Sequence, residues 1–286
     1  MRAMSVHGLD EEFAGELGSR WTRTTPGGGT LVVAGPALRL ALPAGARAGR
    51  YSDAQIDDYD HLPPRRFPWR PPLRMEVRAR ASHPAYPARS MSAEPGGAAG
   101  TDGPQRYLRG TAGFGFWNYP FSLSGAVLRL PEAVWFFAAS PPSNMALVPG
   151  VPGWGWKAQV VHAQRWGAAG WGPAAAPAVL WARVTGREGM AGQLVRRVSG
   201  AAEAPLAADL SVWHEYVIEW RRERARFYVD GAEVLDVPDP PGGPLGFVVW
   251  IDNQYAVATP RGAFRFGTLA SGPEWVELEY VRIMPL

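Results

Sequence analysis

The sequence contains no cysteine, which excludes disulfide bonds, thiolate nucleophiles and cysteine-ligated zinc. Lysine is almost absent as well: Lys157 is the single lysine among 29 basic residues, so arginine carries the positive charge. No apolar run is long enough to cross a bilayer, and residues 1–23 hold no apolar stretch of signal-peptide length. We therefore expect a cytoplasmic protein with no membrane partner.

Motifs for nucleotide and metal chemistry are also missing. The chain has no glycine-rich phosphate loop, dinucleotide fingerprint or nucleophile elbow. Its five histidines show no metal-ligand spacing. The net charge is +3, and the charged residues are scattered rather than gathered in a basic stripe. The sequence thus predicts no cofactor, no metal and no nucleic-acid partner, and it leaves the oligomeric state open.

Turn-forming residues are abundant. The chain has 34 glycines and 28 prolines, interleaved with short apolar runs, a pattern typical of many short strands joined by turns. In residues 72–80, Leu73, Met75 and Val77 would share one face, with Arg74 and Glu76 on the other. This alternation predicts an antiparallel strand with one face in solvent.

The last third of the chain gives the clearest strand pattern. Residues 216–220, 224–229 and 232–237 form three apolar-rich runs, and Asp230-Gly231 is a tight-turn dipeptide between the last two. These runs predict a three-strand meander. Further strands are expected within residues 112–119, 133–138, 156–162, 245–252, 263–266 and 275–283, and earlier at 31–34 and 38–42.

Two stretches depart from this pattern. Residues 82–110 are rich in Pro, Gly, Ala and Ser and predict a long loop. Residues 174–200 have apolar residues at helical spacing and predict a short helical insertion. A chain of this length fits one β-domain, so we expect a single domain over residues 1–286.

Several segments, taken in order, resemble the laminarinase- and lichenase-type glycoside hydrolases of the concanavalin A-like superfamily. They are Glu12-Phe13-Ala14-Gly15 with Trp21, residues 75–79 (MEVRA), residues 113–117 (GFGFW), and residues 213–220 (WHEYVIEW) followed by 227–231 (FYVDG). The last two mark adjacent back strands in that family. The resemblance implies an all-β, two-sheet antiparallel jelly-roll sandwich. Its residues are mostly core and turn residues, so they indicate fold rather than activity.

The catalytic strand of that family has no counterpart here. Those hydrolases carry E-x-D-x-x-E on the strand after the Phe-Trp strand, and its outer carboxylates are the nucleophile and the general acid. The corresponding segment places Glu132 at the first position and Val134 and Phe137 at the other two. A hydrocarbon side chain cannot transfer a proton or attack an anomeric carbon. The usual mechanism is therefore not expected.

Aromatic side chains are the first candidates for ligand binding, because flat rings stack on sugars or enclose apolar molecules. The chain has 13 tryptophans. Those expected near the ligand face are Trp117, Trp135, Trp154, Trp156, Trp166, Trp171 and Trp250. Each one also fits ordinary core packing, so the group is a stronger indication than any member.

Polar residues directly follow an apolar run near the end of the chain. Asp252 and Gln254 would share a face with Trp250 on an extended strand. Asp252 would then act as an acid or base, Asn253 or Gln254 would orient it, and Tyr255 would lie beside them. The same Asp-Asn pair also fits a turn cap.

Two further polar groups are candidates. Lys157 shares a face with Gln159, and a desolvated ammonium can lose its proton where a guanidinium cannot; an exposed surface position is the alternative. Asp53, Gln55 and Asp57 share a face that could bind a cation or a sugar hydroxyl, although an ordinary structural strand is favoured.

Three functions follow as hypotheses. The first is a carbohydrate-associated protein that binds an oligosaccharide or cleaves it with carboxylates from other strands, for which Glu132, Asp252 and Asp57 are candidates. The second is an enzyme of isomerase, cyclase, hydratase or lyase type. It would act on a small apolar molecule in an aromatic-lined pocket, with Asp252 as acid or base. The third is a scaffold without a small ligand.

Overall fold

The alternation of apolar and polar side chains builds two antiparallel sheets in the computed structural model, which describes residues 8–62, 67–88, 106–118, 131–148, 150–162, 200–258 and 264–286. Within these ranges the only helical element is a 3-10 turn, Pro26–Gly28, so nothing long and apolar enough to cross a membrane as a helix is found there. The expected helical insertion at 174–200, apart from Gly200, and residues 89–105 of the expected loop lie outside the described residues.

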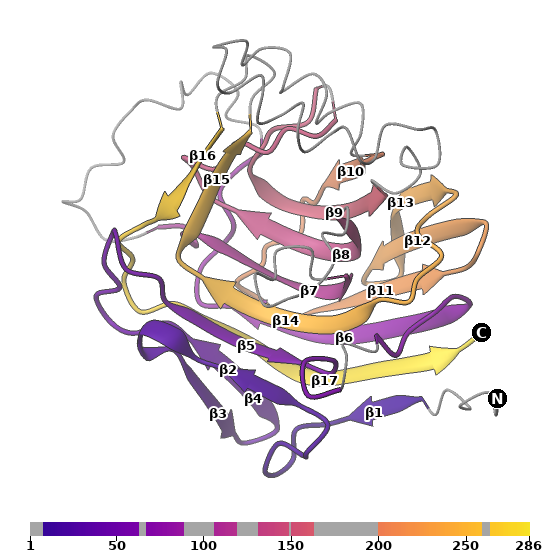
Figure 1. Cartoon of the computed structure of the whole chain (residues 1–286), viewed down its shortest axis with the longest axis horizontal. Helices are drawn as coiled ribbons and strands as arrows, with labels where there is room; N and C mark the ends of the chain where they lie inside the picture. Colours follow the sequence, from indigo (N-terminus) through magenta and orange to yellow (C-terminus); the bar gives the residue numbers. More distant parts are fainter. Residues whose placement is uncertain are drawn as a thin grey trace.

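The first sheet has the order β13-β12-β11-β6-β17-β4-β3, and β1 also pairs with β17 (Figure 1). Its strands are β13 (Ala232–Pro238), β12 (Arg224–Val229), β11 (His214–Trp220), β6 (Leu73–Ala81), β17 (Trp275–Pro285), β4 (Ala37–Ala41), β3 (Thr30–Ala34) and β1 (Leu9–Glu11). The predicted C-terminal meander is confirmed as β11, β12 and β13, which pair in sequence order. The first and last strands therefore belong to the same sheet.

The second sheet has the order β10-β9-β8-β7-β14-β5-β2. Its strands are β10 (Ala202–Pro205), β9 (Gly155–His162), β8 (Glu132–Ala139), β7 (Thr111–Trp117), β14 (Gly246–Asp252), β5 (Asp53–Asp57) and β2 (Thr22–Thr24). A separate hairpin, β15 (Gln254–Ala258) with β16 (Phe264–Thr268), continues from the end of β14 (Figure 1). The expected two-sheet antiparallel sandwich is confirmed.

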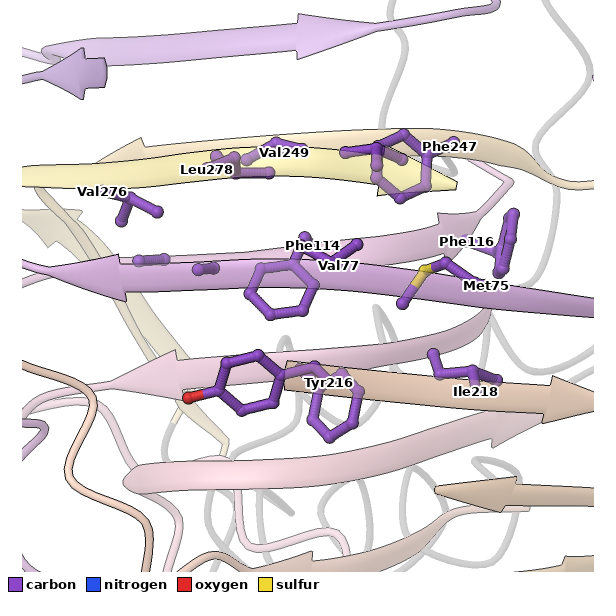
Figure 2. Packing of buried hydrophobic residues seen from close by; sticks show 14 of the residues in the cluster. Met75, Val77, Phe114, Phe116, Tyr216, Ile218, Phe247, Val249, Val276 and Leu278 are labelled. Carbon is purple, nitrogen blue, oxygen red and sulfur yellow. The ribbon is translucent and has the colours of Figure 1, made fainter. Parts of the chain in front are cut away.

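The hydrophobic core lies between the two sheets. Figure 2 shows Val77 and Tyr216 of the first sheet close to Phe114 of the second. On β6 the burial alternates at every residue, so its apolar side chains enter the core while its arginines remain outside. The rings of Phe114 and Phe136 lie 5.2 Å and 5.0 Å from that of Tyr216, so aromatic packing joins the sheets.

A buried ion pair holds one edge of the second sheet. Nζ of Lys157 on β9 lies 2.6 Å from Oε2 of Glu203 on β10, and both side chains are essentially inaccessible to solvent. The ammonium also donates to the carbonyl of Pro152, and Oε1 of Glu203 accepts the backbone N–H of Leu147 at 3.2 Å. Burial lowers the pKa of Lys157, while the facing Glu203 opposes that change. The pair thus ties residues 147–152 to the sheet edge.

We predict that Lys157→Met destabilises the fold by about 3–5 kcal/mol, because Glu203 is left buried without a counter-charge. The double variant Lys157→Met/Glu203→Gln removes the stranded charge and is expected to recover much of that loss. Urea unfolding followed by tryptophan fluorescence measures both free energies. A double variant as unstable as the single one would contradict this account.

Candidate functional site

The outer face of the second sheet carries the side chains that point away from the core. Because side chains alternate along a strand, residues 111, 113, 115 and 117 of β7 face outward while 112, 114 and 116 enter the core. The predicted GFGFW strand thus has phenylalanines inside and glycines outside. Gly113 lies opposite Trp250 and Phe137, and Gly115 lies opposite Trp135. The glycines leave space above the sheet.

Four aromatic side chains occupy this face and form what we call the aromatic platform: Trp117, Trp135, Phe137 and Trp250. The ring centroids of Trp135 and Trp250 are 5.1 Å apart, and Trp135 and Phe137 stack at 5.6 Å with an interplanar angle of 18°. A Cβ on Gly113 would lie 2.7 Å from Cη2 of Trp250, so only glycine lets that indole lie against the sheet. The platform follows directly from the two outward glycines.

Hydrogen bonds fix the three indoles of the platform. Nε1 of Trp117 donates to the hydroxyl of Tyr59 at 2.6 Å, and Nε1 of Trp135 donates to Oε1 of Gln159 at 2.6 Å. Nε1 of Trp250 donates to Oγ1 of Thr111 at 3.0 Å. The polar edges of the rings are therefore satisfied within the protein, and the rings are held in place before any ligand arrives.

Asp252 lies at one end of the platform, where β14 stops. Its Oδ1 accepts the hydroxyl of Thr111 at 2.8 Å and the backbone N–H of Gln254 at 3.0 Å. Burial raises the pKa of Asp252 to about 6, although these hydrogen bonds favour the ionised form. The bond to Gln254 resembles a turn cap, but the buried position beside Trp250 also suits an acid or base.

A second carboxyl, on a strand that the sequence predicts to be structural, lies directly opposite. Asp53 of β5 pairs in register with Asp252 of β14. Burial raises the pKa of Asp53 well above its usual range, with a further contribution from the facing Asp252. The hydroxyl of Tyr51 bonds to Asp53, and the pKa of Tyr51 is also raised by burial. Only the pairing of distant strands could reveal this contact, because the two aspartates are far apart in the sequence.

Two of the predicted catalytic candidates, Glu132 and Asp252, lie far apart. Glu132 pairs with His162 at the far end of β8, whereas Asp252 lies in the row of Thr111 and Ala139. Seven residues of strand separate these rows, roughly 23 Å. Glu132 is two residues from Val134 on β8, so its side chain is on the same, core-facing side of the strand. The outward row of β8 consists instead of Ala133, Trp135, Phe137 and Ala139, without a carboxylate.

The remaining polar candidates have structural partners. Oδ1 of Asn253 accepts the N–H of Ser52, and its Nδ2 donates to the carbonyls of Arg50 and Leu269, each at 2.9 Å. Oδ1 of Asp57 accepts the N–H of Asp60 at 2.8 Å and closes the turn after β5. Asn253 and Asp57 thus hold loops, as Lys157 does at the opposite edge. Their ligand-binding roles stay predictions.

The other predicted ligand residues fall into different environments. Trp156 lies in the core against Phe114 and Phe136, and Trp154 is buried just before β9. Gln254 is half-buried beside the acid pair and bonds to Tyr51, while the ring of Tyr255 packs over Gly267 in the β15–β16 hairpin. Trp166 and Trp171 lie outside the described residues. Of the predicted tryptophans, the structure gathers Trp117, Trp135 and Trp250 on one face.

Comparison with known proteins gives a likeness of fold at low sequence identity. A scan against protein-family models and a search of curated proteins both give no match. Among solved structures, a β-1,3-glucanase from Mycobacterium marinum superposes with a TM-score of 0.51 at 14% identity, covering 96% of this chain and 97% of that one. A structure described as a native glycosidic hydrolase gives 0.50 at 14% identity, covering 100% and 99%. The chain therefore has the concanavalin A-like sandwich fold found in glucanases and other glycoside hydrolases.

Proposed function

We propose that the outer face of the second sheet binds the sugar rings of a glycan, with the aromatic platform as its floor. The observation that carries the proposal is a set of four contacting rings whose polar edges are satisfied internally. Sugar rings present C–H groups that stack on such surfaces and hydroxyls that need polar partners at the edge. Gln55, which is half-buried and flanks the platform on β5, supplies an amide there.

The proposed activity is binding rather than cleavage by the usual route. The outward row of β8, which holds Ala133, Trp135, Phe137 and Ala139, is entirely apolar. Its aromatic residues supply stacking area, but no group that can transfer a proton. A carbohydrate-binding role therefore uses the aromatic rings of β8 for stacking. Any cleavage would need the carboxyl groups of β5 and β14.

A second candidate is an enzyme acting on a small apolar molecule. Asp252 supports it, because this carboxyl has a raised pKa and lies beside the indole of Trp250. Native mass spectrometry of the purified protein separates the two candidates, since a co-purified apolar molecule favours the enzyme and bound hexose units favour glycan binding.

We predict that a β-1,3-glucan hexasaccharide binds the wild-type protein and that Trp135→Ala weakens binding about tenfold or more, because Trp135 contacts every other ring of the platform. Isothermal titration calorimetry measures both affinities. Trp213→Ala is the matched control, since Trp213 stacks on Arg78 and Arg80 at the first sheet. Wild-type protein that binds no β-glucan at millimolar concentration would refute the proposal.

Gly113→Ala tests whether the indole of Trp250 needs a glycine beneath it. The added Cβ would meet the carbonyl oxygen of Phe136 at 2.3 Å and the ring of Trp250 at 2.7 Å. We expect the indole to move, with a changed tryptophan emission spectrum and an affinity reduced severalfold. Gly242→Ala is the control, because a Cβ there meets no atom within 4 Å. Equal affinities and spectra for the two variants would contradict the packing argument.

A further inference from the structure

Two buried carboxyls face each other at the polar end of the platform. Asp53 and Asp252 are register partners on the neighbouring antiparallel strands β5 and β14, and both point outward from the core. Facing side chains of such a pair have Cβ atoms about 4.5–5.5 Å apart. Asp53 is 2% exposed and Asp252 is 7% exposed. Their carboxyls are therefore neighbours in a site with little water.

The surroundings do not compensate two negative charges. Within the described ranges neither carboxyl forms an ion pair with an arginine, lysine or histidine. The neighbouring titratable groups are Tyr51 and Asp57 on the β5 side, and β7 presents the uncharged Thr111. Oδ1 of Asp53 is buried and has no hydrogen-bond partner in the described part of the chain. One oxygen of the pair thus needs a proton, a donor or a ligand.

Like charges this close and this buried do not ionise together, so such a pair retains one proton over a wide pH range. Burial raises the pKa of Asp252 to about 6 and raises that of Asp53 well above its usual range, and the facing Asp252 adds to the effect on Asp53. In its singly protonated form the pair has one O–H donor and one carboxylate acceptor.

We propose that Asp53 and Asp252 form a proton-sharing carboxyl pair that binds a hydroxyl group of the ligand on the aromatic platform. This inference rests on the proposed glycan binding and adds the group that selects an uncharged hydroxylated ring. A singly protonated pair matches a hydroxyl, which both donates and accepts hydrogen bonds.

The position of the pair fits this role. Asp252 is two residues from Trp250 on the same face, roughly 6.6 Å along the strand. A ring stacked on Trp250 would therefore place its edge at the carboxyls. Thr111 links the two parts, because its hydroxyl accepts from Nε1 of Trp250 and donates to Oδ1 of Asp252. Trp250 of the platform and Asp252 of the pair are thus joined through one hydroxyl.

Carbon-detected NMR of the ligand-free protein, labelled with ¹³C-aspartate, tests proton sharing. We expect two separate titration steps for the pair, the first near the value of Asp252 and the second well above it. Asp252→Asn should lower the pKa at which Asp53 titrates, because the facing charge is gone. Asp53→Asn should leave the pKa of Asp252 nearly unchanged. If the two carboxyls titrate independently, each at the usual pKa of aspartate, the proposal that they share a proton is wrong.

Calorimetric titration with the β-1,3-glucan hexasaccharide at neutral pH tests the role in binding. We expect Asp252→Leu and Asp53→Leu each to weaken affinity about tenfold, since leucine offers the ligand hydroxyl neither a donor nor an acceptor. Circular dichroism confirms that each variant folds, and either folded variant suffices for the test. Asp236→Leu, the same change at a residue paired with Arg224 on the first sheet, should bind like the wild type.

The outcomes separate the two proposals. Wild-type affinity in both Asp53→Leu and Asp252→Leu overturns the carboxyl subsite while glycan binding on the platform stands. If the wild-type protein does not bind the glucan, the proposed ligand-binding roles of the aromatic platform and of the carboxyl pair are both overturned. Tighter binding of a glucosamine hexasaccharide than of the neutral glucan would show a pair without a proton, which selects a cation instead of a hydroxyl.

Discussion

The strand β7 imposes the constraint on which the rest of the site depends. Its phenylalanines and glycines alternate, so Phe114 and Phe116 enter the core while Gly113 and Gly115 face outward. The inner row anchors the second sheet to the first through contacts such as Phe114 with Tyr216. Gly113 and Gly115 in the outer row have no side chains, and indoles from the neighbouring strands lie in that space. One alternating strand thus produces both a packed core and room for an aromatic platform.

The two faces of the second sheet illustrate how one fold can support different chemistry. The core face is set by the need to exclude water and fill volume, so its apolar side chains are largely interchangeable. The outer face is not constrained in this way, and here β8 presents tryptophan and phenylalanine rather than acids. The acids of this face lie on β5 and β14, displaced across the sheet from β8. Likeness of fold to a glucanase therefore leaves the activity open.

Buried polar residues on this sheet divide into two kinds. Lys157, Asn253 and Asp57 have their hydrogen-bonding capacity met by Glu203, loop carbonyls and turn N–H groups, respectively. Such groups stabilise loops, because each would cost free energy if left unpaired. Asp53 differs, since one of its carboxyl oxygens is buried without a partner among the described residues. That difference marks a place where a ligand or a proton is needed.

Local patterns in the sequence determined the long strands and the C-terminal meander, because alternation with period two is a property of neighbouring residues. The sandwich class followed from the resemblance to the laminarinase- and lichenase-type hydrolases. Short strands such as β10 and β15 escaped prediction, since their pairing partners supply most of their stability. The sequence also indicated Trp117, Trp135, Trp250 and Asp252. Only the tertiary structure decided that Trp156 belongs to the core, that Glu132 lies far from Asp252, and that Asp53 faces Asp252. Strand order and register set these relations, and both depend on contacts between residues far apart in the chain.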